Sequence, residues 1–228
     1  ITAADKAFAA IKTDGTVVTW GHAYFGGNST SVTDQLIEVQ FISATDEAFA
    51  AIKMDGSVVT WGDPFYGGDS LTVGNQLTEV QAISASSRAF AAIRSDGMVV
   101  TWGDTGFGAD SSLVADQLIG VQSIAATERD FAAIKADGSV VTWGYSFATY
   151  SADTISVIGQ LTGVQLISAT DRAFAAIKAD GSVVTWGDWS SGGDSRSVAD
   201  QLIGVQSISA TGGAFAAIKA DGSVVTWG

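Results

Sequence analysis

The chain has 228 residues, no cysteine and a formal net charge of −13, with 11 Lys and Arg against 24 Asp and Glu. The absence of cysteine excludes disulfides and thiolate metal sites but leaves the cellular compartment open. So acidic a surface repels phosphates, which argues against nucleic-acid binding, and apolar runs of only four or five residues argue against direct membrane insertion.

The predicted elements follow a sequence repeat, and the first residue lies inside one copy of it. Residues 1–10 match residues 42–51, so we expect the chain to be part of a longer or processed protein. A hairpin of the form FAAI(K/R)xDGxVVTWG recurs six times, up to Gly228. Its tryptophans lie 41, 41, 41, 43 and 41 residues apart: Trp20, Trp61, Trp102, Trp143, Trp186 and Trp227.

Each repeat predicts three strands, as residues 39–81 illustrate. Alternating apolar and small residues predict strands over 39–44 and 48–53. Asp55-Gly56 is typical of a tight hairpin turn, after which 57–61 forms the third strand. Gly62 ends it, a polar and glycine-rich loop follows, and 73–77 predicts a short fourth strand. Both faces of this sheet are apolar, as blades packed between blades require.

A period near 40 built from short strands is the pattern of a β-propeller with one blade per repeat. We therefore predict an all-β fold, a propeller of about six blades built from 41-residue repeats, in one domain covering residues 1–228. Each WG tryptophan should be mostly buried between blades. An incompletely closed ring and part of a larger ring both remain open.

The same residues resemble the regulator-of-chromosome-condensation (RCC-like) family of propellers. The resemblance rests on the order of four segments, 42–45, 49–52, 55–56 and 58–62, which recur through nearly the whole chain. The repeats here are a short variant of that family's. The resemblance implies the fold, but no member's activity carries over, because the DG and WG residues build the blade.

No arrangement of catalytic residues appears in the sequence. The only histidine, His22, lies where sister repeats have Asp63, Asp104, Tyr145 and Asp188. General acid–base and nucleophilic catalysis need a base with an orienting partner. We therefore predict no enzymatic activity, no catalytic residue and no cofactor.

The loop carboxylates and glycines also fit structural roles. Asp63 and Asp69 flank Gly67-Gly68, and similar pairs recur in other loops. Ca²⁺ takes about six to eight oxygen ligands, whereas turn capping needs only one carboxylate. The Gly-Gly pairs lack the Lys-Ser/Thr of a phosphate loop. We predict turns here and no metal site.

Six of the eleven basic residues occupy one repeat position, shortly before the Asp of each DG turn. We favour solvated charges with local ion pairs over a ring of positive charge that receives an acidic peptide. The six residues are Lys12, Lys53, Arg94, Lys135, Lys178 and Lys219.

Aromatic residues in the loops after WG are the candidate partner-binding site. Exposed aromatics at this density are typical of interfaces, although inward-folded plugs between blades are equally compatible with the sequence. The predicted partner-binding residues are Tyr145, Phe147, Tyr150, Phe65, Tyr66 and Trp189.

We therefore predict a non-enzymatic protein-binding or scaffold propeller, a subunit or domain of a larger assembly. Two alternatives stay open. One is a guanine-nucleotide exchange regulator of a small GTPase, which needs an irregular charged insertion that the sequence does not show. The other is a carbohydrate- or ion-binding propeller that uses the Gly-Gly-Asp-Ser loops.

Overall fold

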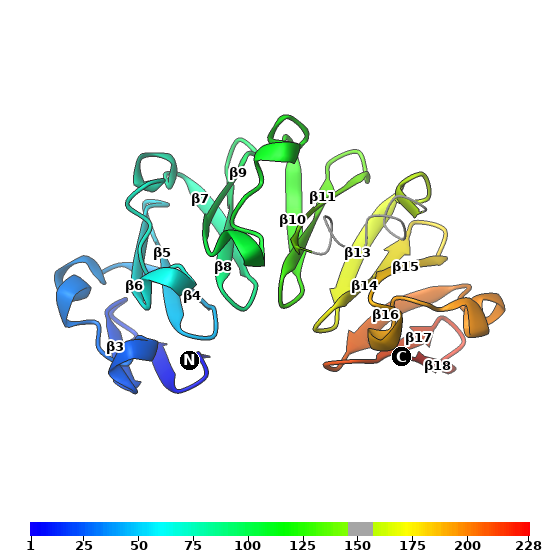
Figure 1. The fold of residues 1–228 in the computed structure, drawn as a ribbon, viewed down its shortest axis with the longest axis horizontal. Coiled ribbons are helices and arrows are strands. Elements are labelled where there is room, and N and C mark those ends of the chain that lie inside the picture. The colour runs from blue at the N-terminus through cyan, green and yellow to red at the C-terminus, as the bar shows by residue number, and fades with distance from the viewer. Residues whose placement is uncertain (146–156) are drawn as a thin grey trace. The chain divides into compact units, whose positions relative to one another are not determined.

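The computed structural model describes residues 1–145 and 157–228. Contacts divide the chain into two compact units, Ile1–Gly120 and Val121–Gly228, which are described separately (Figure 1). Within the described residues each unit contains three antiparallel sheets of three strands, with consecutive strands paired. We call each sheet a blade and each segment between a WG and the next blade a connector. The prediction of one domain over 1–228 stays a prediction.

The first unit contains blades one to three with their connectors. Blade one is β1 (Thr2–Ala3), β2 (Ala7–Ile11) and β3 (Val17–Gly21), followed by the 3₁₀ helices η1 (Ala23–Phe25) and η2 (Thr30–Gln35). Blade two is β4 (Val39–Ala44), β5 (Ala48–Lys53) and β6 (Val58–Gly62), followed by η3 (Pro64–Tyr66) and η4 (Gly74–Gln76). Blade three is β7 (Val80–Ala85), β8 (Ala89–Arg94) and β9 (Val99–Gly103), followed by η5 (Thr105–Phe107) and η6 (Ser112–Gln117).

The second unit contains blades four to six. Blade four is β10 (Val121–Ala126), β11 (Asp130–Lys135) and β12 (Val140–Gly144). Blade five is β13 (Val164–Ala169), β14 (Ala173–Lys178) and β15 (Val183–Gly187), followed by η7 (Trp189–Ser191) and η8 (Arg196–Gln201). Blade six is β16 (Val205–Ala210), β17 (Phe215–Lys219) and β18 (Val224–Trp227). No helix in the described part of the chain is long and apolar enough to span a membrane.

The hairpin forms as the sequence predicts, and its turn is hydrogen-bonded to the first strand of the next blade. Phe49 pairs with Trp61 across β5 and β6, and Gly56 takes a φ of 76° in the DG turn. The Gly56 carbonyl accepts a hydrogen bond from Val80 N–H at 2.9 Å, where the following blade starts. Within each unit, a hairpin therefore sets the position of the strand that begins the next blade.

Blades stack by packing aromatic side chains against alanines. Phe49 and Trp61 are stacked with ring centroids 5.2 Å apart. They belong to one buried cluster with Ala7 and Ala9 of the preceding blade. The same pattern joins Phe90 and Trp102 to blade two, and Phe215 and Trp227 to blade five. Alanine, a poor strand former alone, recurs here because a larger side chain would hold the sheets apart.

The predicted fourth strand is wrong. Residues 74–76 form η4, a single 3₁₀ turn, and the corresponding parts of other connectors are 3₁₀ helices as well. The Gly and Asn of this stretch disfavour a strand. The turn directs Leu77 into the cluster between blades two and three. A buried leucine occupies the same position in the other connectors: Leu36, Leu118, Leu161 and Leu202.

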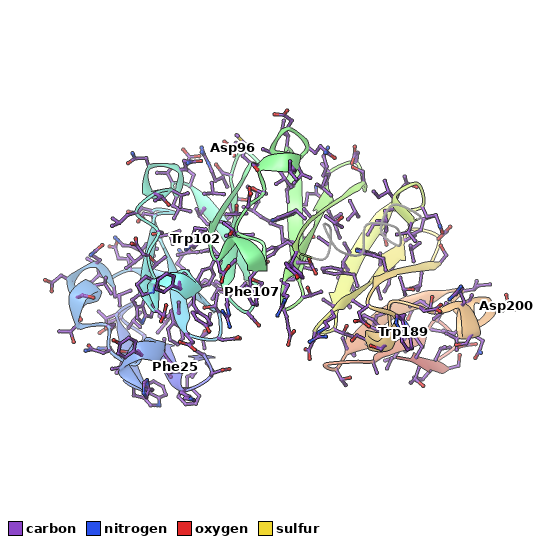
Figure 2. The ribbon with its side chains drawn as sticks, in the orientation of Figure 1. Phe25, Asp96, Trp102, Phe107, Trp189 and Asp200 are labelled. Atoms are coloured by element: carbon purple, nitrogen blue, oxygen red, sulfur yellow. The ribbon has the colours of Figure 1, made fainter. Side chains whose placement is uncertain are left out.

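Burial of the WG tryptophans is confirmed for five positions and wrong for Trp20. The other five indoles are 3–6% exposed, whereas Trp20 is 42% exposed. Within each unit a WG tryptophan is covered by the blade before it, and β1 is the first strand among the described residues. Trp102 lies inside the first unit (Figure 2).

These two tryptophans provide a matched pair for testing the stacking. Trp102→Ala should lower the free energy of unfolding by about 3–5 kcal/mol, because it leaves a cavity between blades. Trp20→Ala should cost clearly less, because its indole is already partly in water. Urea denaturation at low protein concentration measures both, and equal losses would contradict the assignment of Trp102 to an inter-blade core.

Candidate partner-binding face

The strand order places the start of each connector at the end of the blade opposite the DG turn, and we call this end the connector end. The connector then returns to the DG end, where the next blade begins, as the hydrogen bond from Val80 N–H to the Gly56 carbonyl shows. In blade three, Asp96 follows β8 and Phe107 follows β9, so the two residues mark opposite ends of the sheet (Figure 2). The turn between the first and second strands, which contains Arg88, lies at the connector end. This end therefore combines the least repetitive sequence of each repeat with a fixed backbone.

A glycine fixes the direction in which each connector leaves its blade. Gly62 has a φ of 108°, and a Cβ placed on it would lie 2.5 Å from the Glu47 carbonyl oxygen. Only glycine fits that approach. Further along the connector, the Gly67 carbonyl accepts a hydrogen bond from Trp102 Nε1 at 3.0 Å. The Gly-Gly pairs thus hold the connector against the next blade, as turns rather than a phosphate loop.

The loop carboxylates act as turn caps, as the sequence indicates. Phe65 N–H donates to Asp63 Oδ1 at 2.8 Å, and Leu71 N–H donates to Asp69 Oδ1 at 2.9 Å. The same two bonds recur in the connectors of blades three and five, where the acceptors are Asp104, Asp110, Asp188 and Asp194. Within residues 1–145 and 157–228, no three His, Cys, Asp or Glu side chains gather as a metal-binding group.

Some connector aromatics are covered by a cation from a neighbouring turn. The Arg88 guanidinium lies 4.6 Å from the ring centre of Tyr66 and 4.5 Å from that of Phe107. Its Nη1 also lies 3.8 Å from Asp104 Oδ2. Burial raises the pKa of Tyr66, and Arg88 partly offsets that rise. Arg88 therefore joins the second connector to the third, a role that the sequence pattern does not predict.

Two further cation–aromatic contacts follow this pattern. Lys6 Nζ lies 4.7 Å from the ring centre of Phe25, and the Arg129 guanidinium lies 5.2 Å from that of Tyr145. Tyr66 and Tyr145, both predicted to contact a partner, thus already contact a cation of their own chain. Phe147 and Tyr150 lie outside the described residues, and their assignment stays a prediction.

The other two predicted aromatics project into solvent. Phe65 in η3 is 80% exposed and Trp189 in η7 is 77% exposed. Tyr24 in η1 is exposed in the same way, although it is not among the six predicted residues. Tyr145 is 46% exposed although Arg129 contacts its ring, so a cation contact and exposure occur together at this residue. Neither alternative from the sequence applies to all of the aromatics.

Each unit has a groove beside one of these exposed rings. In the first unit a groove of about 450 Å³ is lined by Tyr24, Asn28, Asp63 and Pro64. In the second unit a groove of about 430 Å³ is lined by Gln160, Trp189, Asp194 and Arg196. Arg196 Nε donates to Asp194 Oδ1 at 2.8 Å, and this bond helps to lower the pKa of Asp194 to about 2.

The basic residues before the DG turns and the single histidine make local contacts within their own repeat. Lys12, Lys53 and Arg94 lie 4.0, 4.0 and 3.1 Å from the Asp of their own DG turn. These distances favour the local ion pairs over an unbalanced positive ring. His22 packs edge-on against Phe25 with centroids 4.9 Å apart.

Solved structures share this fold at low sequence identity. Human WBSCR16 matches all of this chain and 76% of its own, with a TM-score of 0.65 and 16% identity. Yeast RCC1 (Prp20), solved bound to Kap60, matches all of this chain and 69% of its own, with a TM-score of 0.62 and 17% identity. The CRINKLY ectodomain of the Arabidopsis thaliana receptor kinase ACR4 matches 99% of this chain and 77% of its own, with a TM-score of 0.56 and 19% identity.

No protein-family model and no curated protein sequence matches the chain. The structural matches nevertheless confirm the predicted fold, an RCC1-like repeat β-propeller with six blades in the described residues.

The DG turns provide a pH prediction. Ser57 Oγ and N–H donate to Asp55 Oδ1 at 2.6 and 2.9 Å, which lowers the pKa of Asp55 below 3.8. A carboxyl group whose pKa is lower in the folded than in the unfolded state stabilises the fold at pH values above its unfolded-state pKa. This stabilisation is lost as the pH falls through the folded-state pKa. Four other turns share the bonds and the direction, those of Asp14, Asp137, Asp180 and Asp221. The melting temperature should therefore fall as the pH drops below about 4.

Carboxyl titration by NMR checks the cause. Ser57→Ala should move the pKa of Asp55 back toward 3.8, whereas Ser57→Thr should leave it low, because Thr16 makes the same bonds to Asp14. An unchanged pKa in Ser57→Ala would contradict the hydrogen-bond explanation.

Proposed function

We propose that this chain is a non-enzymatic protein-binding propeller, a scaffold subunit or domain that contacts its partner through the connector end of its blades. The observation that carries the proposal is the exposure of Phe65 and Trp189 on connectors whose backbone is fixed by caps and by contact with the next blade. Large aromatic side chains held rigidly in water are typical anchors of protein interfaces.

The distribution of sequence variation supports the connectors over the strands. The strands repeat almost unchanged because each must pack against the same neighbours, whereas the connectors differ from one repeat to the next. Loops on a rigid scaffold can change recognition without changing the fold. The connectors therefore offer a partner a surface that differs from one blade to another.

The charges around the exposed rings favour a basic partner. Phe65 lies two residues from Asp63, and Trp189 follows Asp188 directly. Both carboxylates cap a turn beside an apolar anchor. With a net charge of −13, the chain should attract a basic segment at long range, and this attraction raises the association rate more than the final affinity.

The structural neighbours support the class of function. Yeast RCC1 (Prp20) is bound to Kap60 in one solved structure, and another structure of Prp20p is described together with its binding to Gsp1p and histones. Those partners belong to those proteins. They support protein binding as a use of this fold and leave the partner of this chain to experiment.

Two connector substitutions test the proposal. Phe65→Ser and Trp189→Ser should each weaken partner capture by the immobilised chain about 30-fold or more, the effect of losing an anchor worth about 2 kcal/mol. The melting temperature should stay nearly unchanged, because both side chains lie in water. Quantitative capture from an extract of the source cells, followed by calorimetry with the captured partner, measures the loss.

Met54→Ser is the matched control, because Met54 is an exposed apolar side chain at a DG turn, the other end of the blade. It should bind as the unmodified chain does. Equal binding by all three variants would place the interface elsewhere, and loss of binding in the Met54 variant alone would assign it to the DG end.

A further inference from the structure

The first connector contains the one asparagine of the chain that a hydroxyl residue follows at the second position. Asn28-Ser29-Thr30 matches Asn-X-Ser/Thr, with X other than proline, which is the acceptor motif for N-linked glycosylation. The only other asparagine, Asn75, has Leu77 at that distance and does not match. So short a motif also arises by chance, and the surroundings of Asn28 decide whether it is usable.

Asn28 occupies a turn-capping position at which three other connectors have aspartate. Thr30 donates to Asn28 Oδ1 through its Oγ1 and through its N–H, the latter at 3.0 Å. Asp69, Asp110 and Asp194 accept the same backbone bond in their own connectors. The cap uses only Oδ1, so it does not require asparagine. What asparagine adds is the amide nitrogen Nδ2, the atom to which N-linked sugars are attached.

The amide nitrogen of Asn28 can carry a substituent without disturbing a contact. Within residues 1–145 and 157–228, Asn28 Nδ2 makes no hydrogen bond, and the residue is exposed. Asn28 lines the groove of about 450 Å³ in the first unit together with Tyr24 and Asp63. A group attached to Nδ2 therefore extends into the groove and the solvent and leaves the core between the blades unchanged.

This exposure follows from the connector and does not depend on the place of blade one in the chain. Blade two has a neighbouring blade on each side within the first unit. Its connector nevertheless exposes Asp69 and Leu71, the equivalents of Asn28 and Thr30. The acceptor site would therefore stay accessible with a further blade packed beside blade one.

We propose that Asn28 is an N-glycosylation site and that the attached glycan lies along the groove of the first unit. In the transfer, Asn28 Nδ2 attacks the anomeric carbon of a lipid-linked oligosaccharide diphosphate, the donor of this class of reaction. A bond forms between Nδ2 and the sugar, and the bond between the anomeric carbon and the diphosphate oxygen breaks. The lipid diphosphate leaves, and Nδ2 loses one proton to solvent. The chain must therefore reach the lumen of a secretory compartment, where the membrane-bound transferase acts.

Tyr24 is the groove residue suited to hold the first sugars. It lies four positions before Asn28 and is 73% exposed. The negative face of an aromatic ring attracts weakly positive groups such as the C–H groups of a sugar ring. Phe65 and Trp189, the aromatics on which the proposed function rests, are not among the described residues that line this groove. A glycan at Asn28 is therefore compatible with partner binding through those two residues.

Mass spectrometry of the protein purified from its source cells tests the proposal. Peptides that contain Asn28 should carry the mass of a glycan, and an amidase that releases N-linked glycans should leave aspartate at this position. Peptides that contain Asn75 should be unmodified and provide an internal control. Absence of the glycan from all Asn28 peptides would overturn the proposal.

Three variants expressed in the same cells relate the glycan to the motif. Asn28→Asp introduces the residue of the other connectors, so this variant should keep its melting temperature and lose the glycan. Thr30→Val removes the hydroxyl group and should lose the glycan as well, whereas Thr30→Ser should retain it. A glycan that persists in Asn28→Asp or in Thr30→Val would contradict the assignment to Asn28.

Asp110→Asn is the matched variant that gains a site. It places the motif at the equivalent position of the third connector, because Ser111 and Ser112 follow, and it keeps the acceptor for Ser112 N–H. This variant should acquire a second glycan. If neither asparagine is modified, the chain does not meet the transferase, and if only the introduced one is modified, the surroundings of Asn28 prevent transfer. Either result refutes the proposal. Partner capture is not measured here, so the outcome is independent of the proposed function.

Discussion

The packing of a Phe–Trp pair on two alanines of the preceding blade is the interaction on which the rest of the structure depends. A stacked pair such as Phe90 and Trp102 is broad and flat, and it can approach a sheet closely only where the facing side chains are small. The FAAI segment supplies both halves of this contact, because successive side chains point to opposite faces. Its phenylalanine faces the preceding blade and its flanking alanines face the next, except that blade four has Asp130 before its phenylalanine.

This arrangement explains why the strands repeat and the connectors do not. Any larger residue at Ala50 or Ala92 would separate two sheets, so all six repeats have alanine at these two positions. The fold restricts the residue type at fewer positions of a connector: a glycine where it leaves the blade, a capping carboxylate and one buried leucine. Residues between these fixed points, such as Phe65, are free to differ, and that freedom is what recognition requires.

The sequence predicts most of what depends on short-range pattern. The DG turns, the paired hairpin strands and the capping role of Asp63 all follow from neighbouring residues. The 3₁₀ turn at 74–76 does not, because the signal in Val73 and Leu77 is shared by a strand and by a turn that buries one leucine. Of the six predicted partner residues, Phe65 and Trp189 are exposed as expected, whereas Tyr66 is covered by an arginine 22 positions later.

The exposure of Trp20 shows what a repeat pattern cannot predict. Six nearly identical hairpins imply six identical environments, yet the burial of a WG tryptophan also depends on the blade packed against its indole. Trp20 and Trp61 have the same local sequence, the same ring partner and the same stacking geometry. They differ only in what lies against them. In a stack of repeats, burial is therefore a property of the interface between blades and not of the repeat itself.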